Sequence, residues 1–234
     1  MRKFLLSILA VIILAPSTIK AQDYLFDSPD NAPYLGVRLG FDIVSLQSPS
    51  EVYGNRGGIE IGAVYNMPLW KNLYFEPGVS LFYNSATVNG VLNSFGSELQ
   101  GICSGTLNNV GIRIPLNFGY HFDITDAIQI LPFTGPQINL NLSHSVNYAT
   151  DAAVEKGLAQ PRLHYNFIDL GWNFGVGVKF LRYYIGVSGQ VGMSSFISQN
   201  AKDYTVTIPG LNEARTLPLH ARRNLFQITL GYNF

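Results

Sequence analysis

The sequence predicts an all-β fold, an eight-stranded antiparallel up-and-down transmembrane β-barrel, on three observations. Beyond residue 33, eight segments alternate bulky apolar side chains with small or polar ones at a period of two, as β-strands do. The segments run to about 10–16 residues, whereas strands of globular proteins centre on five or six and a tilted transmembrane strand needs 9–11. Their connections are alternately short and long, as in barrels inserted from one side of a membrane.

The first three strands are expected at 34–46, 58–67 and 72–83. "YLGVRLGFDIVSL" puts leucine, valine, phenylalanine and isoleucine on one face and Arg38 and Asp42 on the other. "GIEIGAVYNM" and "NLYFEPGVSLFY" repeat this division, each with one glutamate and with glycine on the polar face.

The fourth and fifth strands are expected at 109–122 and 127–142. Both alternate, but they contain Pro115, Pro132 and Pro136. A closed barrel has no free edge, and proline has no N–H to donate to a β-ladder. We therefore expect bulges or broken pairing at these prolines.

The last three strands are expected at 167–180, 182–193 and 224–234. "FIDLGWNFGVGVKF" and "NLFQITLGYNF" alternate along their whole length. The interior of an eight-stranded barrel is just wide enough for side chains to fill. It has no room for all the bulky rings, so we expect the apolar face to meet lipid and the polar face to line the bore.

The connections set the orientation of the barrel. The short ones are "PLWKN", "DITD" and "LR", and the long ones cover 47–57, 84–108, 143–166 and 194–223. We expect the long loops on the outer surface, and an even strand count returns both ends of the barrel to the periplasmic side.

Composition excludes several classes of function. Charged residues make up 13 % of the chain, against roughly a quarter in soluble proteins. The 15 basic and 15 acidic residues balance, so neither nucleic-acid binding nor an acidic tail is indicated. Four histidines and one cysteine at scattered positions suggest neither a metal site nor a cofactor, and Cys103 cannot form an intramolecular disulfide.

The first 21 residues have the layout of a secretory signal peptide. Arg2 and Lys3 precede an apolar run at 4–15, which is shorter than the roughly 20 residues of a membrane-spanning helix. We expect cleavage before Gln22, a short periplasmic segment at 22–33 and a barrel domain at 34–234. No lipid anchor and no peptidoglycan-binding domain are expected.

Four segments carry a resemblance to a known family. "IRIPLNFGYHF", "PFTGPQINLNL", "GWNFGVGVKF" and "ITLGYNF" resemble the PorT-like outer-membrane β-barrel domain family of Gram-negative bacteria, over about residues 33–234. The resemblance implies a small porin-like barrel in the cell outer membrane. It also implies that Phe226, Tyr232 and Phe234 form the terminal signal that the barrel-assembly machinery recognises.

Charged side chains on the polar face form the most specific group in the sequence. We expect a lumen network of Arg38, Asp42, Glu60, Glu76, Arg113, His121, Asp169 and Lys179. Charges inside a protein must be paired or wetted. The network is either a salt-bridge plug that fills the bore, which we favour, or a narrow path for protons or ions.

Two other groups lie in the expected loops or near them. Arg215, Arg222 and Arg223 precede the last strand and are candidates for contact with lipopolysaccharide phosphates, although an ordinary solvated loop would have the same composition. "SHS" (143–145), Glu155, His164 and His220 contain the residue types of a lipid-modifying hydrolase, but no G-x-S-x-G motif occurs.

Aromatic residues toward the strand ends suggest girdles at the two membrane interfaces. The candidates are Tyr34, Tyr65, Trp70, Tyr74, Tyr83, Tyr120, Tyr183 and Tyr232, and Trp172 is too deep to assign.

The leading functional interpretation is a non-enzymatic membrane scaffold whose long loops contact a protein partner, a surface ligand or lipopolysaccharide. The alternative is a small passive porin-like channel or a transport- or secretion-associated barrel, and a lipid-modifying enzyme is a third possibility.

Overall fold

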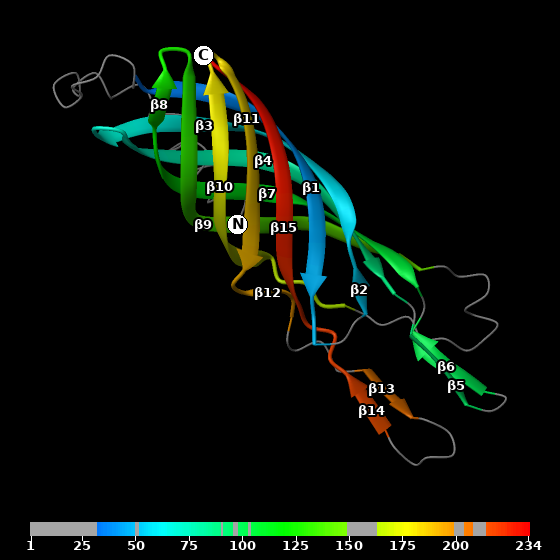
Figure 1. Ribbon diagram of the computed structural model, residues 1–234. Coiled ribbons are helices and arrows are strands. Elements are labelled where there is room, and N and C mark those ends of the chain that lie inside the picture. Colours follow the sequence, from blue (N-terminus) through cyan, green and yellow to red (C-terminus); the bar gives the residue numbers. More distant parts are fainter. Residues whose placement is uncertain are drawn as a thin grey trace.

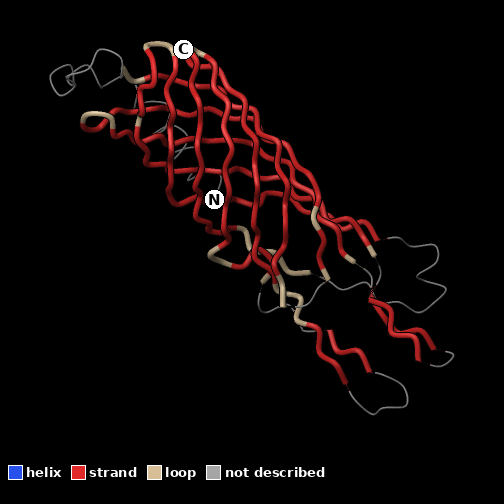
Figure 2. Tube along the Cα trace, in the orientation of Figure 1, coloured by secondary structure: helices blue, strands red, loops and turns tan. Residues whose placement is uncertain are grey.

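The computed structural model describes residues 32–49, 52–89, 91–95, 98–102, 104–148, 163–198, 204–207 and 214–234. The regular structure in these residues is β-strand, arranged as a tilted cylinder (Figures 1 and 2). Among them, no helix has the length and apolarity that a membrane crossing requires. The expected signal peptide and almost all of segment 22–33 lie outside the described residues.

Eight long strands form one closed antiparallel sheet. They are β1 (Tyr34–Gln47), β3 (Arg56–Trp70), β4 (Leu73–Val88), β7 (Gly105–Tyr120), β9 (Ile128–Tyr148), β10 (Ile168–Phe180), β11 (Tyr183–Gly192) and β15 (Ala221–Asn233). Each pairs with the next in this order, and β15 returns to pair with β1 from Gly36–Asn233 to Gln47–Arg222. The predicted eight-stranded antiparallel barrel is confirmed.

Short strands extend the barrel at its two ends. β2 (Tyr53–Gly54) pairs with β4, β8 (Phe122–Thr125) with β9, and β12 (Ser195–Ile197) with β15. Two hairpins, β5 (Val91–Phe95) with β6 (Glu98–Ile102) and β13 (Tyr204–Thr207) with β14 (Ala214–Leu217), belong to the long connections. We call the end of the barrel that carries these two hairpins the long-loop end. The opposite end, which holds the C-terminus in Figure 1, is the short-turn end.

Two of the short turns place a non-glycine residue in the left-handed backbone region. Lys71 has φ 50° between β3 and β4, and Leu181 has φ 52° between β10 and β11. This conformation lets two residues reverse the chain between adjacent strands.

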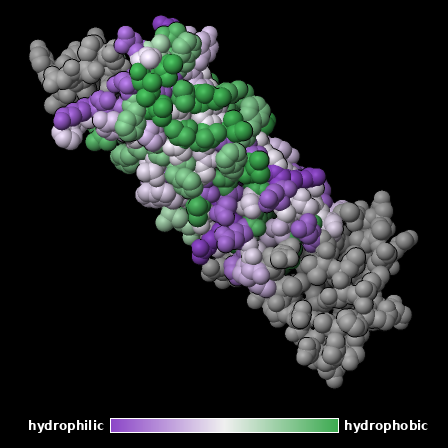
Figure 3. Space-filling view, viewed as in Figure 1, coloured by the Kyte–Doolittle hydropathy of each residue, from purple (hydrophilic) through white to green (hydrophobic). Residues whose placement is uncertain are grey.

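Apolar side chains point away from the cylinder along its middle. Ile43, Ile61, Leu81, Phe174 and Leu230 are 44–58 % exposed although they are large and apolar. Most residues that alternate with them along the strands face the bore and are small, polar or charged, and the buried Val44 and Phe82 are apolar exceptions. In Figure 3 the green residues accordingly cover the middle of the barrel, while purple residues gather toward its ends.

Prolines interrupt the ladder on one side of the barrel. Between β3 and β4 the pairing skips from Val64–Gly78 to Met67–Phe75. Between β4 and β7 it skips from Pro77–Leu116 to Ser80–Arg113. Between β7 and β9 it skips from Pro115–Gln137 to Phe118–Thr134. The pairing is therefore broken beside Pro115 and Pro136, as expected. Pro132 and Pro136 nevertheless pair with β10, opposite Val176 and Trp172.

The polarity of the two faces reverses toward the long-loop end. There the inward side chains are apolar and form a buried cluster of Leu46, Val52, Ala86, Val88, Leu107, Phe196, Ile197, Leu219 and Ala221, which we call the outer cap. The outward side chains at the same level are polar, for example Ser85, Asn108 and Ser143. This part of the barrel therefore has the arrangement of a water-soluble β-structure, which the sequence analysis did not predict.

The expected aromatic girdle is wrong at two positions. Tyr34 and Tyr74 are 8 % and 2 % exposed and face the bore, because they share their strand face with Arg38 and Glu76. Trp70 and Tyr183, each 63 % exposed, do lie outward at the short-turn end.

Candidate functional site: the polar bore and its outer cap

The polar bore contains one group of charges near the short-turn end. Arg38 Nη1 donates to Asn233 Oδ1 at 2.7 Å, and its Nη2 lies 3.9 Å from Glu76 Oε2. The guanidinium also stacks 4.1 Å from the centre of the Tyr184 ring. We call these residues the inner layer.

Two further ionisable residues lie in the same half of the bore. Lys179 Nζ is 4.8 Å from the centre of the Tyr34 ring. The imidazole of His121 meets the Tyr74 ring edge-on, with 4.5 Å between centroids. Glycines make room for the large side chains here: a Cβ at Gly36 or Gly231 would overlap Arg38.

A second group of charges lies closer to the long-loop end. Arg113 Nη1 is 3.2 Å from Asp42 Oδ2 and also pairs with Glu60. Arg113 Nε donates to Asn139 Oδ1 at 3.3 Å, and Gln227 Nε2 donates to Asp42 Oδ1 at 2.8 Å. One cation from β7 thus holds carboxylates from β1 and β3.

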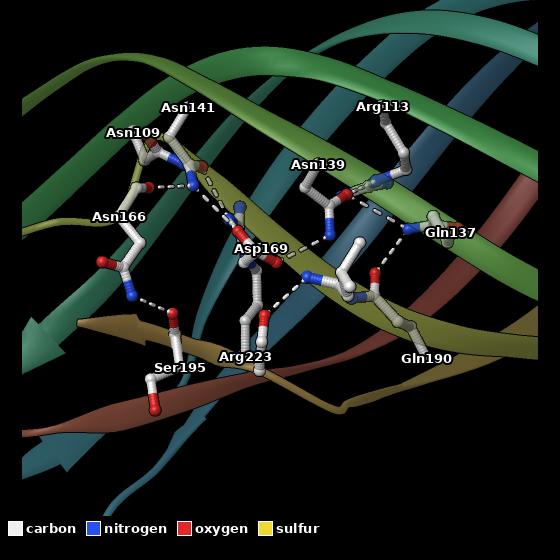
Figure 4. A network of polar contacts seen from close by, with 12 residues as sticks. Asn109, Arg113, Gln137, Asn139, Asn141, Asn166, Asp169, Gln190, Ser195 and Arg223 are labelled. Carbon is white, nitrogen blue, oxygen red and sulfur yellow. Dashed lines mark hydrogen bonds and ion pairs between the residues drawn. The ribbon is translucent and has the colours of Figure 1, made fainter. Parts of the chain in front are cut away.

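Amides connect this group to a further ion pair (Figure 4). Arg223 pairs with Asp169, and the carboxylate of Asp169 also accepts hydrogen bonds from the amides of Asn139 and Asn141, each at 2.8 Å. Asn109 and Arg223 both donate to Asn141 Oδ1. We call the set around Arg113 and Arg223 the outer layer.

The structure brings the eight expected lumen residues into these two halves of the bore. Asp42, Glu60, Arg113 and Asp169 lie in the outer half, and Arg38, Glu76, His121 and Lys179 in the inner half. The amides Asn139, Asn141 and Gln137 share a strand face of the fifth segment and belong to the network, although they were not among its expected members. Their alternation with Ile138 and Leu140 was the signal.

Arg223 does not lie where the sequence analysis expected it. It is 1 % exposed, inside the bore, and its guanidinium is paired with Asp169, so it cannot reach a lipid phosphate. The strand β15 begins at Ala221 and not at residue 224, and Arg223 shares the inward face with Leu225 and Gln227. Arg222 is exposed, and the side chain of Arg215 lies outside the described part of the chain.

The outer cap closes the bore above the outer layer. Ile197, Leu219 and Phe196 are at most 2 % exposed, and the Phe196 ring stacks on Arg223 at 4.4 Å. Tyr53 Oη donates to the Leu219 carbonyl at 2.8 Å, which fastens the segment before β15. Phe196 and Ile197 come from the beginning of the last long connection and Leu219 from its end, so these two stretches fold into the mouth of the barrel.

A small cavity separates the two charged layers. Its volume is about 50 Å³, and its lining includes Arg38 and Glu76 of the inner layer and Glu60 and Arg113 of the outer layer. Ser80 and Asn173 also line it.

Comparison with known proteins identifies the family of this barrel. Residues 27–198, well over half of the chain, match the model of the "Outer membrane protein beta-barrel domain" family. The chain belongs to this family. It is therefore an outer-membrane β-barrel protein. In barrels of this class the short turns face the periplasm and the long loops face the outside.

Solved structures of other outer-membrane barrels are similar to this chain at low identity. Neisserial surface protein A matches with 14 % identity and a TM-score of 0.37, over 86 % of this chain and 97 % of that one. The N-terminal barrel domain of Pseudomonas aeruginosa OprF matches with 11 % identity and a TM-score of 0.34, over 85 % and 97 %. Ail of Yersinia pestis, in complex with a heparin analogue, matches with 10 % identity and a TM-score of 0.32, over 86 % and 97 %. No match was found among curated proteins.

The candidate enzyme residues of this outer-membrane barrel are not assembled into a catalytic group in the described part of the chain. His144 lies opposite the buried Asn109 in the β7–β9 ladder, with its ring centroid 3.9 Å from that of Tyr165, which packs against the outer cap. Asp169, a described acid in the outer half of the bore, is 1 % exposed and paired with Arg223. Glu155 lies outside the described residues. Those that are described contain no group of three or more histidine, cysteine, aspartate or glutamate side chains that could hold a metal ion.

The three residues of the expected assembly signal lie on β15, the strand that closes the barrel against β1, or next to it. Phe226 and Phe234 are 47 % and 67 % exposed and point toward lipid. The Tyr232 ring packs edge-on against the rings of Tyr183 and Phe234. The Phe234 N–H donates to the Leu35 carbonyl at 2.8 Å, so the end of β15 is fixed to β1.

Proposed function

We propose that this outer-membrane barrel is a non-enzymatic scaffold that holds its long loops at the cell surface, where they contact a protein partner, a surface ligand or lipopolysaccharide. The observation that carries this proposal is the closure of the bore. Two layers of paired charges fill it and the outer cap lies over them. A barrel closed in this way offers its outer end, and not its lumen, for interaction.

Export and membrane assembly of the chain fit the same proposal. Residues 1–21 act as the export signal, residues 22–33 form a short periplasmic segment, and Phe226, Tyr232 and Phe234 guide the barrel-assembly machinery. Within the outer-membrane family, we place the chain with the PorT-like barrels. Pull-down from native outer membranes with the full chain, compared with a chain in which the β13–β14 hairpin is replaced by a short glycine-serine turn, would identify a loop-dependent partner.

Two exposed arginines at the long-loop end support contact with lipopolysaccharide. Arg222 and Arg56 are exposed at the outer ends of β15 and β3, on either side of β1. Guanidinium groups bind phosphate through paired hydrogen bonds. We assign the phosphate contact to Arg56 and Arg222. Arg56 replaces Arg223, which is buried in the bore, as a candidate for this contact.

Lipid A binding tests this contact. The double variant R56Q/R222Q should retain less lipid A after purification and bind lipid A-containing vesicles more weakly than the wild type. R182Q is the matched control, because Arg182 is an exposed arginine at the periplasmic end. Equal lipid A retention in all three proteins would reject the assignment.

Conductance tests the scaffold against a passive pore. The purified barrel in planar bilayers should show no steady current. A steady current that R113Q or E60Q abolishes would overturn the scaffold and favour the porin-like alternative. Deacylation of lipid A by the purified protein, lost in S145A or H144A, would instead favour an enzyme.

A further inference from the structure

The three interruptions of the ladder lie next to one another. Each contains one proline: Pro77 faces Tyr65 and Asn66 across β3 and β4, Pro115 faces the β4 stretch at 78–79, and Pro136 faces the β7 stretch at 116–117. The gaps follow one another across four consecutive strands. We call this part of the wall, made of residues 65–66, 76–79, 114–117 and 135–136, the proline panel.

The cavity lies directly behind the proline panel. Val64, Glu76, Val79, Pro115 and Asn117, from the panel or next to it, line the cavity. On the opposite wall, β10 and β11 pair without a break from Gly171–Gly192 to Phe180–Tyr183. The barrel thus has a continuous wall on one side of the cavity and an interrupted wall on the other.

Buried polar groups at the cavity lack hydrogen-bond partners among the described residues. Ser80 Oγ has none, and Arg38 Nη2 has only the ion pair with Glu76 at 3.9 Å. Both residues are at most 7 % exposed. Leaving a buried polar group without a hydrogen bond is unfavourable, so partners are expected.

The lining selects a small neutral ligand. Arg38 and Arg113 are balanced by Glu60 and Glu76, so neither an anion nor a cation is favoured. A water molecule needs about 10–15 Å³ of such volume and two to four polar partners. A cavity of about 50 Å³ therefore has room for a few water molecules.

We propose that this cavity binds a cluster of water molecules, which hydrogen-bond to Arg38, Ser80 and backbone groups at the interruptions of the ladder. In lipid, every backbone polar group of a spanning strand needs a partner inside the protein. Water in the bore supplies it where proline has removed the ladder bond. The barrel wall is consequently hydrated from the inside on this one side.

Replacing Ser80 by valine gives opposite results for a wet and a dry cavity. In a wet cavity, S80V displaces water that serves Arg38 and the panel, so the urea midpoint of unfolding in lipid should fall. In a dry cavity, S80V removes an unpaired hydroxyl and fills space, so the midpoint would rise and the proposal would be wrong. S45V, on the outward face of β1 away from the cavity, controls for the substitution itself.

Hydrogen exchange in lipid nanodiscs decides the matter even if S80V does not fold. Amides of the proline panel should exchange at least about tenfold faster than those of β10 and β11 at the same depth, because the ladder is interrupted there and water reaches them. In S80V the panel amides should exchange more slowly than in the wild type. Panel amides as protected as those of β10 and β11 in the wild type would overturn the proposal.

Discussion

Arg113 Nη1 lies 3.2 Å from Asp42 Oδ2, which joins β7 to β1 across the bore, although β3 and β4 separate these strands in the sheet. The same guanidinium pairs with Glu60 of β3. Both side chains of the Arg113–Asp42 pair are at most 2 % exposed. The pair is a brace inside the cylinder, made by residues that the ladder does not connect.

Removing the cation of this brace should destabilise the barrel strongly. R113M leaves two carboxylates buried without their partner, and breaking a buried pair in this way costs about 3–5 kcal/mol. Urea unfolding in lipid vesicles measures the loss. The triple variant R113M/D42N/E60Q should recover part of it, because no unpaired charge remains. A loss below about 1 kcal/mol in R113M would show that water already screens these groups.

The outer cap should behave as a protein core. I197A should lower the free energy of unfolding by about 2–5 kcal/mol and I197V by about 0.5–1.5 kcal/mol, since Ile197 is fully buried and its loss leaves a cavity. I185A is the control, because Ile185 is 53 % exposed on the lipid face, where fluid lipid fills the space. Equal losses in I197A and I185A would mean that the cap collapses freely and is not packed.

The alternation of the sequence predicted the eight strands and which residues share a face, because a period of two is a local property. It did not predict what each face meets. Leu46 and Leu107 lie on the same faces as Asp42 and Arg113, yet they contact the outer cap, because the barrel continues beyond the apolar belt. Beyond the apolar belt the inward side chains become apolar and the outward ones polar. A strand whose end is set by its outward apolar residues is therefore predicted too short. Arg223 was missed for this reason.

The turn at Leu181 offers a test of backbone strain. A non-glycine residue in the left-handed region costs about 1–2 kcal/mol, and a β-branched one tolerates it least. L181V should therefore lower the free energy of unfolding by about 1–2 kcal/mol, and L181G should not. L39V, at a lipid-facing strand position that is 42 % exposed, controls for the lost methylene. A loss in L181V no larger than in L39V would show that the turn carries no strain.

The indole of Trp172, which lies too deep for the interfacial girdle, forms a hydrogen bond to a residue of the neighbouring strand. Its Nε1–H donates to Thr134 Oγ1 of β9 at 2.8 Å, and the Thr134 hydroxyl donates to the Asn173 carbonyl at 3.0 Å. Thr134 is diagonal to Trp172 in the ladder, where Pro136 stands opposite. Only the register between two strands brings this donor and acceptor together.

Replacing Thr134 by valine should leave the indole N–H without an acceptor on the lipid face. The expected loss is about 1–3 kcal/mol in free energy of unfolding, because an unpaired polar group facing hydrocarbon keeps its full desolvation cost. In the W172F background, T134V should cost clearly less, and the double-mutant cycle measures the coupling. Trp172 fluorescence, followed in W70F to remove the second indole, should shift in T134V as the hydrogen bond is lost. Additive effects of T134V and W172F together with an unchanged spectrum would show that the indole finds another acceptor.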